Sequence, residues 1–187
     1  MSDRLKGKKV LLITSNTGVE RDELLKPLKA LAADGGSITH ASIEGGDVQT
    51  VLHDTEKDAV VKSTAKLSDV SARDFDVLVV PGGTVNADKL RVDKDAQHLV
   101  QDFVGASKPI AAICHGPWIL VDAGVIEGKT LTSYQSVKTD LLNAGAEEWV
   151  DQQVKRCGAN GWTLITSRNP RDLDAFSSAI AEELVAA

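Results

Sequence analysis

Hydrophobic and polar residues follow each other along the chain in blocks that match the strands of an α/β protein. Residues 9–14 (KVLLIT), 75–80 (FDVLVV) and 110–113 (IAAI) are almost continuously apolar. Such runs are typical of strands that are covered on both faces, as in a parallel sheet. Residues 37–42 (SITHAS) alternate between apolar and polar positions and predict a further strand.

Helical periodicity fills the segments between these strands. In residues 21–33 four leucines, at positions 24, 25, 28 and 31, share one stripe, and Gly35 and Gly36 follow as stop signals. Further helices are predicted over residues 93–104, 117–123, 137–143 and 172–185. Strands that alternate with helices of this length predict an α/β fold with a doubly wound parallel sheet between layers of helices.

Two segments depart from the simple alternation. Residues 150–157 and 162–166 flank Asn160 and Gly161, which predicts a small antiparallel hairpin with a tight turn. Residues 45–69 show only short β-like pieces and no clear period. With no repeat and no linker, we expect one domain over residues 1–187.

Composition and charge narrow the class of protein. Hydrophobic residues make up 42% and charged residues 26%, and the net charge is -6. This balance opposes binding to nucleic acid or to an anionic membrane surface. The polar start, the short apolar runs and a count of only two cysteines lead us to expect a cytoplasmic protein without a signal sequence.

Cys114 is the main candidate for chemistry, because it stands between an apolar strand and a predicted helix. Gly116 and Pro117 mark the entry to that helix, so the turn resembles the nucleophile elbow of serine hydrolases. A helix N-terminus favours a thiolate, so we expect Cys114 to be reactive and to oxidise before Cys157. A buried packing cysteine is the structural alternative.

The neighbours of Cys114 supply further candidates. His115 is a possible base, and it is about as often a structural hydrogen-bonding residue. Gly82 and Gly83 end a strand, and their N–H groups, with that of His115, are suited to an oxyanion hole, although a plain turn explains them too. Glu20, between the first strand and the first helix, is either a carboxyl near the sulfur or a helix-start residue.

Motifs for metals and nucleotides are missing from the sequence. The histidines are at positions 40, 53, 98 and 115 and show no metal-ligand spacing, and the two cysteines form no C-x-x-C pair. Neither of the glycine-rich phosphate-binding patterns is found. We therefore expect no metal and no nucleotide or other cofactor. Asp88 and Asp93 are further carboxylates that fit helix starts.

Several of these stretches together resemble the ThiJ/PfpI family, within the class I glutamine amidotransferase-like superfamily. The resemblance rests on residues 75–83 (FDVLVVPGG), 108–117 (KPIAAICHGP), 132–134 (TSY), 143–151 (NAGAEEWVD) and 166–173 (TSRNPRDL). It is nearest to the PfpI-type stress proteins. It implies a flavodoxin-like sandwich in which Cys114 is the elbow cysteine.

The resemblance also implies roles for the candidate residues. Glu20 is expected to hydrogen-bond the sulfur, and Gly83 and His115 to supply the oxyanion-hole N–H groups. In PfpI-type members an acidic residue shortly after the P-G-G stretch reaches the histidine of a neighbouring subunit. Asp88 is the best match for that residue when one inserted residue is allowed. A composite triad of Cys114, His115 and Asp88 and a homodimer or higher homo-oligomer follow as expectations.

The family resemblance leaves the activity open. Members are peptidases, glyoxalases, deglycases, chaperones and oxidative-stress sensors. The first hypothesis is a cysteine-dependent hydrolase or lyase that acts on a small carbonyl adduct or a peptide. The second is a non-enzymatic stress protein, in which Cys114 senses oxidants or the dimer surface holds unfolded client proteins as a chaperone does.

Overall fold

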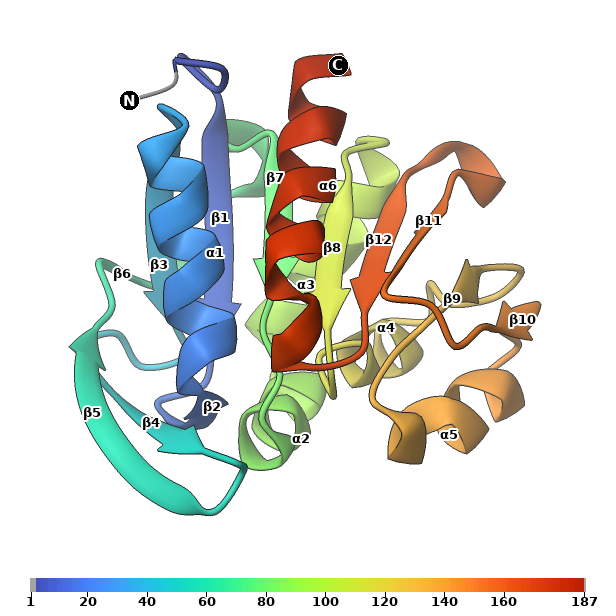
Figure 1. Ribbon diagram of the computed structural model, residues 1–187, viewed down its shortest axis with the longest axis horizontal. Helices are drawn as coiled ribbons and strands as arrows, with labels where there is room; N and C mark the ends of the chain where they lie inside the picture. The colour runs from blue at the N-terminus through green and yellow to red at the C-terminus, as the bar shows by residue number, and fades with distance from the viewer. Residues whose placement is uncertain (1–2, 187) are drawn as a thin grey trace.

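A seven-stranded sheet forms the centre of the computed structural model, which describes residues 3–186 (Figure 1). Its strand order is β11-β12-β8-β7-β1-β3-β6. The strands are β1 (Lys9–Thr14), β3 (Ser37–Ser42), β6 (Ala65–Lys66), β7 (Val77–Val80), β8 (Ile110–Ile113), β11 (Val154–Cys157) and β12 (Leu164–Ser167). All neighbours pair in parallel except β11 with β12. The predicted fold class is confirmed.

Helices cover both faces of this sheet. One face carries α1 (Arg21–Ala33) and α6 (Leu173–Ala186), which lie side by side in front of the sheet in Figure 1. The other face carries α2 (Thr84–Val92), α3 (Lys94–Gly105), α4 (Trp118–Asp122) and α5 (Lys138–Asn143).

The alternation of side chains along β1 produces these two layers. Val10 and Leu12 pack in the core under α1 and α6, whereas Leu11 and Ile13 pack in the core under α3 and α4. All four side chains are fully buried. A strand that is buried on both faces reads as a continuous apolar run, which explains why residues 9–14 were recognisable.

A second, smaller sheet lies beside the carboxyl ends of the central strands. It is formed by β2 (Thr17–Glu20), β4 (Asp47–Leu52) and β5 (Glu56–Lys62), in the order β2-β4-β5. β4 and β5 are the antiparallel hairpin at the lower left of Figure 1. They account for most of the segment without a clear period, because β5 is largely exposed and carries little alternation. A short parallel pair, β9 (Thr130–Leu131) and β10 (Glu148–Trp149), completes the strands.

Helix α2 is absent from the sequence prediction, and this changes the interpretation of Asp88. The helix buries Asn86, Ala87 and Leu90 and exposes valines at both ends, so its pattern is weakly amphipathic. Asp88 lies in the middle of α2 and is not a helix-start residue. Asp93, by contrast, caps α3, because its carboxylate accepts the N–H of Ala96 at 2.9 Å.

The antiparallel hairpin of β11 and β12 is present, but the predicted tight turn is wrong. Cys157 pairs with Leu164, so residues 158–163 connect the strands. Asn160 and Gly161 do adopt positive φ angles of 60° and 77°. The connection is longer because it encloses Lys129, whose buried ammonium donates to the carbonyls of Ala159 and Trp162.

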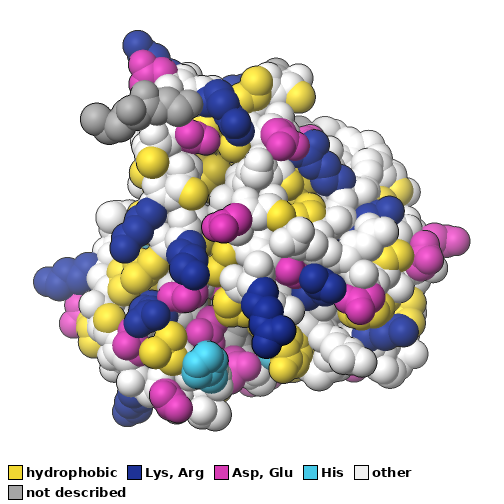
Figure 2. All heavy atoms as spheres, viewed as in Figure 1, with side chains coloured by type: hydrophobic (Ala, Val, Ile, Leu, Met, Phe, Trp, Pro, Cys, Tyr) yellow, Lys and Arg dark blue, Asp and Glu magenta, His cyan; other side chains and the backbone are white. Residues whose placement is uncertain are grey.

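Charged side chains of both signs are interspersed on the face formed by α1 and α6 (Figure 2). This face shows no broad patch of Lys and Arg. Within residues 3–186, no helix has the length and hydrophobicity needed to cross a membrane.

Candidate active site

Cys114 lies on a sharp turn at the end of β8, and its φ angle is 62°. A residue other than glycine in this left-handed region carries a strain of roughly 1–2 kcal/mol. Hydrogen bonds on both sides hold it there: its N–H donates to Ser167 and its carbonyl accepts from Tyr134. Gly116 permits the turn, because a Cβ there would lie 2.6 Å from the carbonyl oxygen of Val80.

The sulfur of Cys114 is surrounded by hydrogen-bonding groups although the residue is only 4% exposed. Nδ1 of His115 lies 3.3 Å from Sγ. The backbone N–H groups of Gly83 and His115 both hydrogen-bond the sulfur. The structure therefore brings together the two N–H groups that the sequence singled out.

The carboxyl group at the sulfur belongs to Glu23, not to Glu20. Glu23 is on the first turn of α1, is fully buried and hydrogen-bonds the thiol of Cys114. Its Oε2 accepts the N–H of Gly82 at 2.7 Å. The expectation that Glu20 bonds the sulfur is wrong, since the chain enters α1 with residue 20 facing the β4–β5 hairpin and residue 23 facing the sheet.

Glu20 has a different set of partners. Its Oε1 accepts the N–H of His53 at 3.3 Å, and its Oε2 accepts the N–H of Asp54 at 3.1 Å. Glu20 occupies the N-cap position of α1, as the helix-start alternative expects, but its side chain makes no capping hydrogen bond there. Glu20 therefore fixes the tip of the β4–β5 hairpin beside the site.

A sequence signal for Glu23 does exist. The buried positions of α1 are 23, 24, 27 and 31, so Glu23 lies one turn before Pro27 on the apolar face of the helix. A carboxylate on such a face requires a partner or a proton. The stripe of leucines identifies the helix but does not by itself single out Glu23.

Protonation of Glu23 and Cys114 is coupled. Burial raises the pKa of Glu23 from 4.5 to about 8, and the charges of Glu20 and Asp54 add to this effect. Burial also raises the pKa of the Cys114 thiol, followed by the charges of Glu23 and Asp54, while the N–H groups of Gly83 and His115 oppose the rise. The resting pair is thus a neutral carboxyl beside a neutral thiol.

The expected lowering of the Cys114 pKa by a helix N-terminus is not found. α4 begins at Trp118, four residues after the cysteine, and has only five residues. The influence of a helix dipole fades within its first turn, and a short helix has a small one. The sulfur of Cys157 also has a hydrogen-bond donor beside it, because it accepts the N–H of Thr130 at 3.4 Å.

His115 is held by aromatic rings and hydroxyl groups. Its ring stacks on that of Tyr134, with 4.7 Å between the ring centroids, and contacts the ring of Trp118, with 5.3 Å between the centroids. Its Nε2 lies 3.3 Å from both Thr84 Oγ1 and Ser136 Oγ. Burial lowers the pKa of His115, and the charge of Asp54 opposes this. Within the single chain Asp88 is exposed on α2, and the polar partners of Nε2 are these two hydroxyls.

A cleft of about 540 Å³ adjoins His115. Tyr134 and Ser136, which both contact the imidazole, belong to its lining. The full lining is Ser133, Tyr134, Gln135, Ser136, Trp149, Asp151, Arg168 and Asn169. None of these residues is a predicted site residue, although most fall in the stretches TSY, NAGAEEWVD and TSRNPRDL that support the family resemblance. Among residues 3–186, no group of three or more His, Cys, Asp or Glu is arranged to hold a metal ion.

The contribution of Glu23 to stability is expected to fall as pH rises from about 5 to 8, because Glu23 holds a proton when folded and releases it when unfolded. The Glu23→Gln variant keeps a neutral side chain and loses this component, roughly 2–4 kcal/mol across the range. Urea unfolding at several pH values measures it. The exposed Glu44→Gln variant serves as the control, and parallel curves for wild type and Glu23→Gln would contradict the assignment.

Fold and site together define a class of protein: an α/β sandwich with a strained cysteine on a strand-to-helix turn. The chain belongs to the DJ-1/PfpI family, whose model matches residues 8–183. The resemblance drawn from the sequence is confirmed.

Individual relatives agree with this membership. The chain is 37% identical over 170 residues to YraA of Bacillus subtilis, named as a candidate cysteine protease, covering 91% of this chain and 94% of the relative. It is 38% identical over 168 residues to Deglycase PH1704 of Pyrococcus horikoshii, covering 90% and 94%. The crystal structure of Drosophila melanogaster DJ-1beta superposes with a TM-score of 0.84 and 33% identity, covering 100% of this chain and 92% of that one.

Proposed function

We propose that this chain is a PfpI-type stress-response enzyme in which Cys114 attacks the carbonyl group of a small aldehyde or of its adduct with an amine. The observation that carries this proposal is the sulfur of Cys114, which lies 3.3 Å from Nδ1 of His115 and accepts two backbone N–H groups. This is deglycase- or glyoxalase-like chemistry, in line with the name of the relative from Pyrococcus horikoshii.

The first chemical step follows from these contacts. The thiol of Cys114 transfers its proton to Nδ1 of His115 as the sulfur bonds to the carbonyl carbon. The electron pair of the C=O bond moves to oxygen, and the N–H groups of Gly83 and His115 stabilise the resulting charge. Glu23, neutral at rest, adds no repulsion to the developing thiolate.

Burial of the thiol favours a small substrate. Cys114 is 4% exposed and His115 is also buried, so an extended peptide meets more obstruction than an aldehyde does. The cleft beside Tyr134 and Ser136 offers room for the rest of an adduct. Peptide hydrolysis is the alternative enzymatic activity, and the name of the relative from Bacillus subtilis supports it.

A substrate panel tests the proposal. Wild type and Cys114→Ala are assayed with methylglyoxal, with methylglyoxal-treated N-acetyl-lysine and N-acetyl-arginine, and with a set of peptides. We expect thiol-dependent turnover of the carbonyl compounds, with kcat/KM for every peptide at least roughly tenfold lower. Faster turnover of a peptide would assign the site to peptidase chemistry.

A second copy of the chain is part of the proposal. Asp88 shares the exposed side of α2 with Val85 and Val92, which are 45% and 66% exposed. Burial of these valines in a homodimer or higher homo-oligomer would stabilise the assembly and bring Asp88 near a neighbour's His115. The composite triad then forms only in the assembly.

An oxidant sensor is the alternative function. A protonated Glu23 beside Cys114 can donate a hydrogen bond to a sulfenate or sulfinate, which favours oxidation of this thiol. Peroxide oxidation of Cys114 without turnover of any compound in the panel would support this alternative. Both functions suit a cytoplasmic protein, since Cys114 and Cys157 are free thiols.

A further inference from the structure

The tip of the β4–β5 hairpin has an unusual backbone. His53 and Asp54 have φ angles of 52° and 65°, and the N–H of Thr55 donates to the carbonyl of Leu52. Tight turns with positive φ at both central positions normally contain Asn and Gly. Two residues with side chains keep this conformation only where their surroundings fix it.

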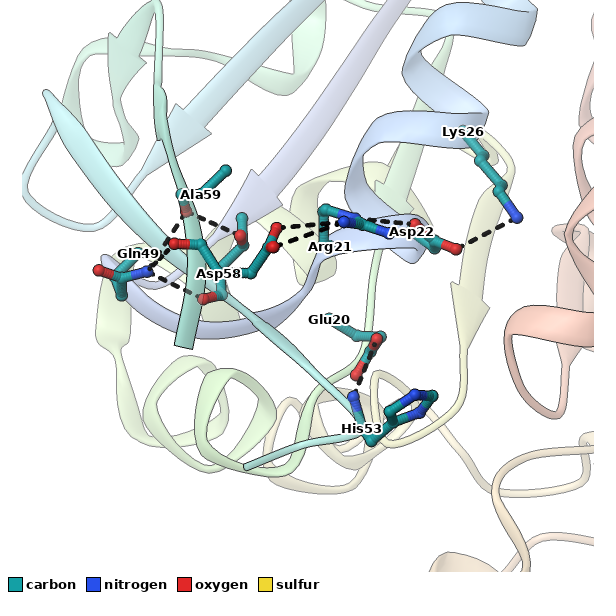
Figure 3. Close-up of polar contacts among 9 residues, drawn as sticks. Glu20, Arg21, Asp22, Lys26, Gln49, His53, Asp58 and Ala59 are labelled. Carbon is teal, nitrogen blue, oxygen red and sulfur yellow. Dashed lines mark hydrogen bonds and ion pairs between the residues drawn. The ribbon is translucent and has the colours of Figure 1, made fainter. Parts of the chain in front are cut away.

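Contacts from β2, α1 and α2 provide that fixation. Both oxygens of the Glu20 carboxylate accept N–H groups of the tip, and Figure 3 shows Glu20 pointing at His53. Arg21 adds a second anchor through its ion pair with Asp58 on β5, at 3.4 Å. From the tip, Asp54 Oδ1 then accepts the N–H of Thr84, the first residue of α2, at 2.7 Å.

This contact joins the hairpin to the reactive thiol. Thr84 Oγ1 lies 3.3 Å from Nε2 of His115, whose Nδ1 lies 3.3 Å from the sulfur of Cys114. To accept the thiol proton, Nδ1 must be unprotonated, so Nε2 carries the hydrogen. That hydrogen needs an acceptor, and the Thr84 hydroxyl is one of the two within reach. A continuous path therefore runs from Asp54 through Thr84 and His115 to Cys114.

Asp54 also acts on the site through its charge. The acidic side chains whose charges act on the Cys114–His115 pair are Glu23 from α1 and Asp54 from the hairpin tip. Tyr134 is a further titratable side chain, and its ring stacks on the imidazole. Asp54 opposes the lowering of the His115 pKa that burial produces. The imidazole is consequently a stronger base with Asp54 in place.

We propose that the hairpin tip is part of the active site, with Asp54 as a positioning residue that holds Thr84 and supports His115 within one chain. Glu20 is the residue that fixes the tip. The turnover part of this inference rests on the proposed function, whereas the positioning and charge effects do not.

The Asp54→Asn variant tests the inference. Asparagine retains an oxygen for the N–H of Thr84 and removes the charge. We expect the NMR titration midpoint of His115, assigned with His115→Gln, to move to lower pH. In a Cys157→Ala background, the pH profile of Cys114 alkylation by iodoacetamide is expected to move in the same direction. With an active substrate, kcat falls roughly tenfold with little change in KM.

Two further variants complete the experiment. Glu20→Gln retains one acceptor for the tip, so we expect smaller shifts in the same direction. Glu56→Gln removes an exposed carboxylate from the same hairpin that makes none of these contacts, and both midpoints should stay at their wild-type values. Wild-type midpoints in Asp54→Asn, or equal shifts in Glu56→Gln, would overturn the inference.

The test of Asp54 and the test of the proposed function can fail independently. If wild type turns over none of the compounds, the proposed function fails, while the titrations still decide the role of Asp54. The loss in Asp54→Asn should be the same at every protein concentration, because the residue acts within one chain. A contribution from the second copy would show in a different way. The activity of the wild type would fall on dilution, and Asp88→Asn would show no further fall on dilution.

Discussion

We expect the Cys114→Ala variant to fold normally and to lose at least about a thousandfold in kcat/KM on any compound that the wild type turns over. The proposed step forms a covalent bond to Sγ, and alanine has no atom that can replace it. The backbone hydrogen bonds of residue 114 to Ser167 and Tyr134 do not involve the side chain, so the turn is retained. Steady-state kinetics and thermal unfolding measure the two effects.

Cys157→Ala is the matched control, since it removes the other free thiol on β11. We expect this variant to keep wild-type kcat/KM, because Cys157 lies on the antiparallel edge strand and not at the carboxyl end of β8. More than a tenth of wild-type activity in Cys114→Ala would place the chemistry on another residue.

The Gly83→Ala variant is expected to lose about 3–5 kcal/mol of unfolding free energy, one of the largest effects of a single methyl group. Gly83 has a φ angle of 89°, and a Cβ there would lie 2.2 Å from the carbonyl oxygen of Gly18 and 2.7 Å from the nitrogen of Glu20. Both atoms belong to the backbone, so β2 or the start of α2 must move. For a chain of this size we expect the melting temperature to fall by roughly 10 °C.

Gly105→Ala provides the comparison for this substitution. Gly105 ends α3, and a Cβ there would meet no atom within 4 Å. Alanine at such a position reduces the entropy of the unfolded chain and should raise stability by about 0.4–1 kcal/mol. Equal melting temperatures for Gly83→Ala and wild type would show that β2 yields more easily than its contacts indicate.

The sequence predicts this fold well where burial is complete. Residues 9–14 and 110–113 are apolar on both faces because helices cover both sides of the sheet, and Cys114 stands out because it interrupts such a run before Gly116 and Pro117. Helix α2 escapes recognition because Asn86 faces inward, where its amide bonds the carbonyls of Pro81 and Gly82.

The site itself is less predictable than the strand that carries it. Glu20 and Glu23 are three residues apart, and only the docking of α1 on the sheet decides which carboxyl reaches the sulfur. Asp54 comes from a hairpin that pairs with β2 outside the main sheet, and no local pattern links it to His115. Contacts of this kind depend on tertiary packing, which periodicity does not encode.

The two backbone hydrogen bonds at Cys114 depend on residues that are synthesised later than the cysteine itself. The partners of this residue lie at Tyr134 and Ser167, and its carboxyl neighbour, Glu23, lies near the opposite end of the sequence. Contacts between such distant residues form late in folding, after the cost of closing long loops has been met. A nascent chain that ends before β12 lacks the carbonyl of Ser167 that accepts the N–H of Cys114, so the full set of hydrogen bonds at this turn forms only after residue 167 has been synthesised.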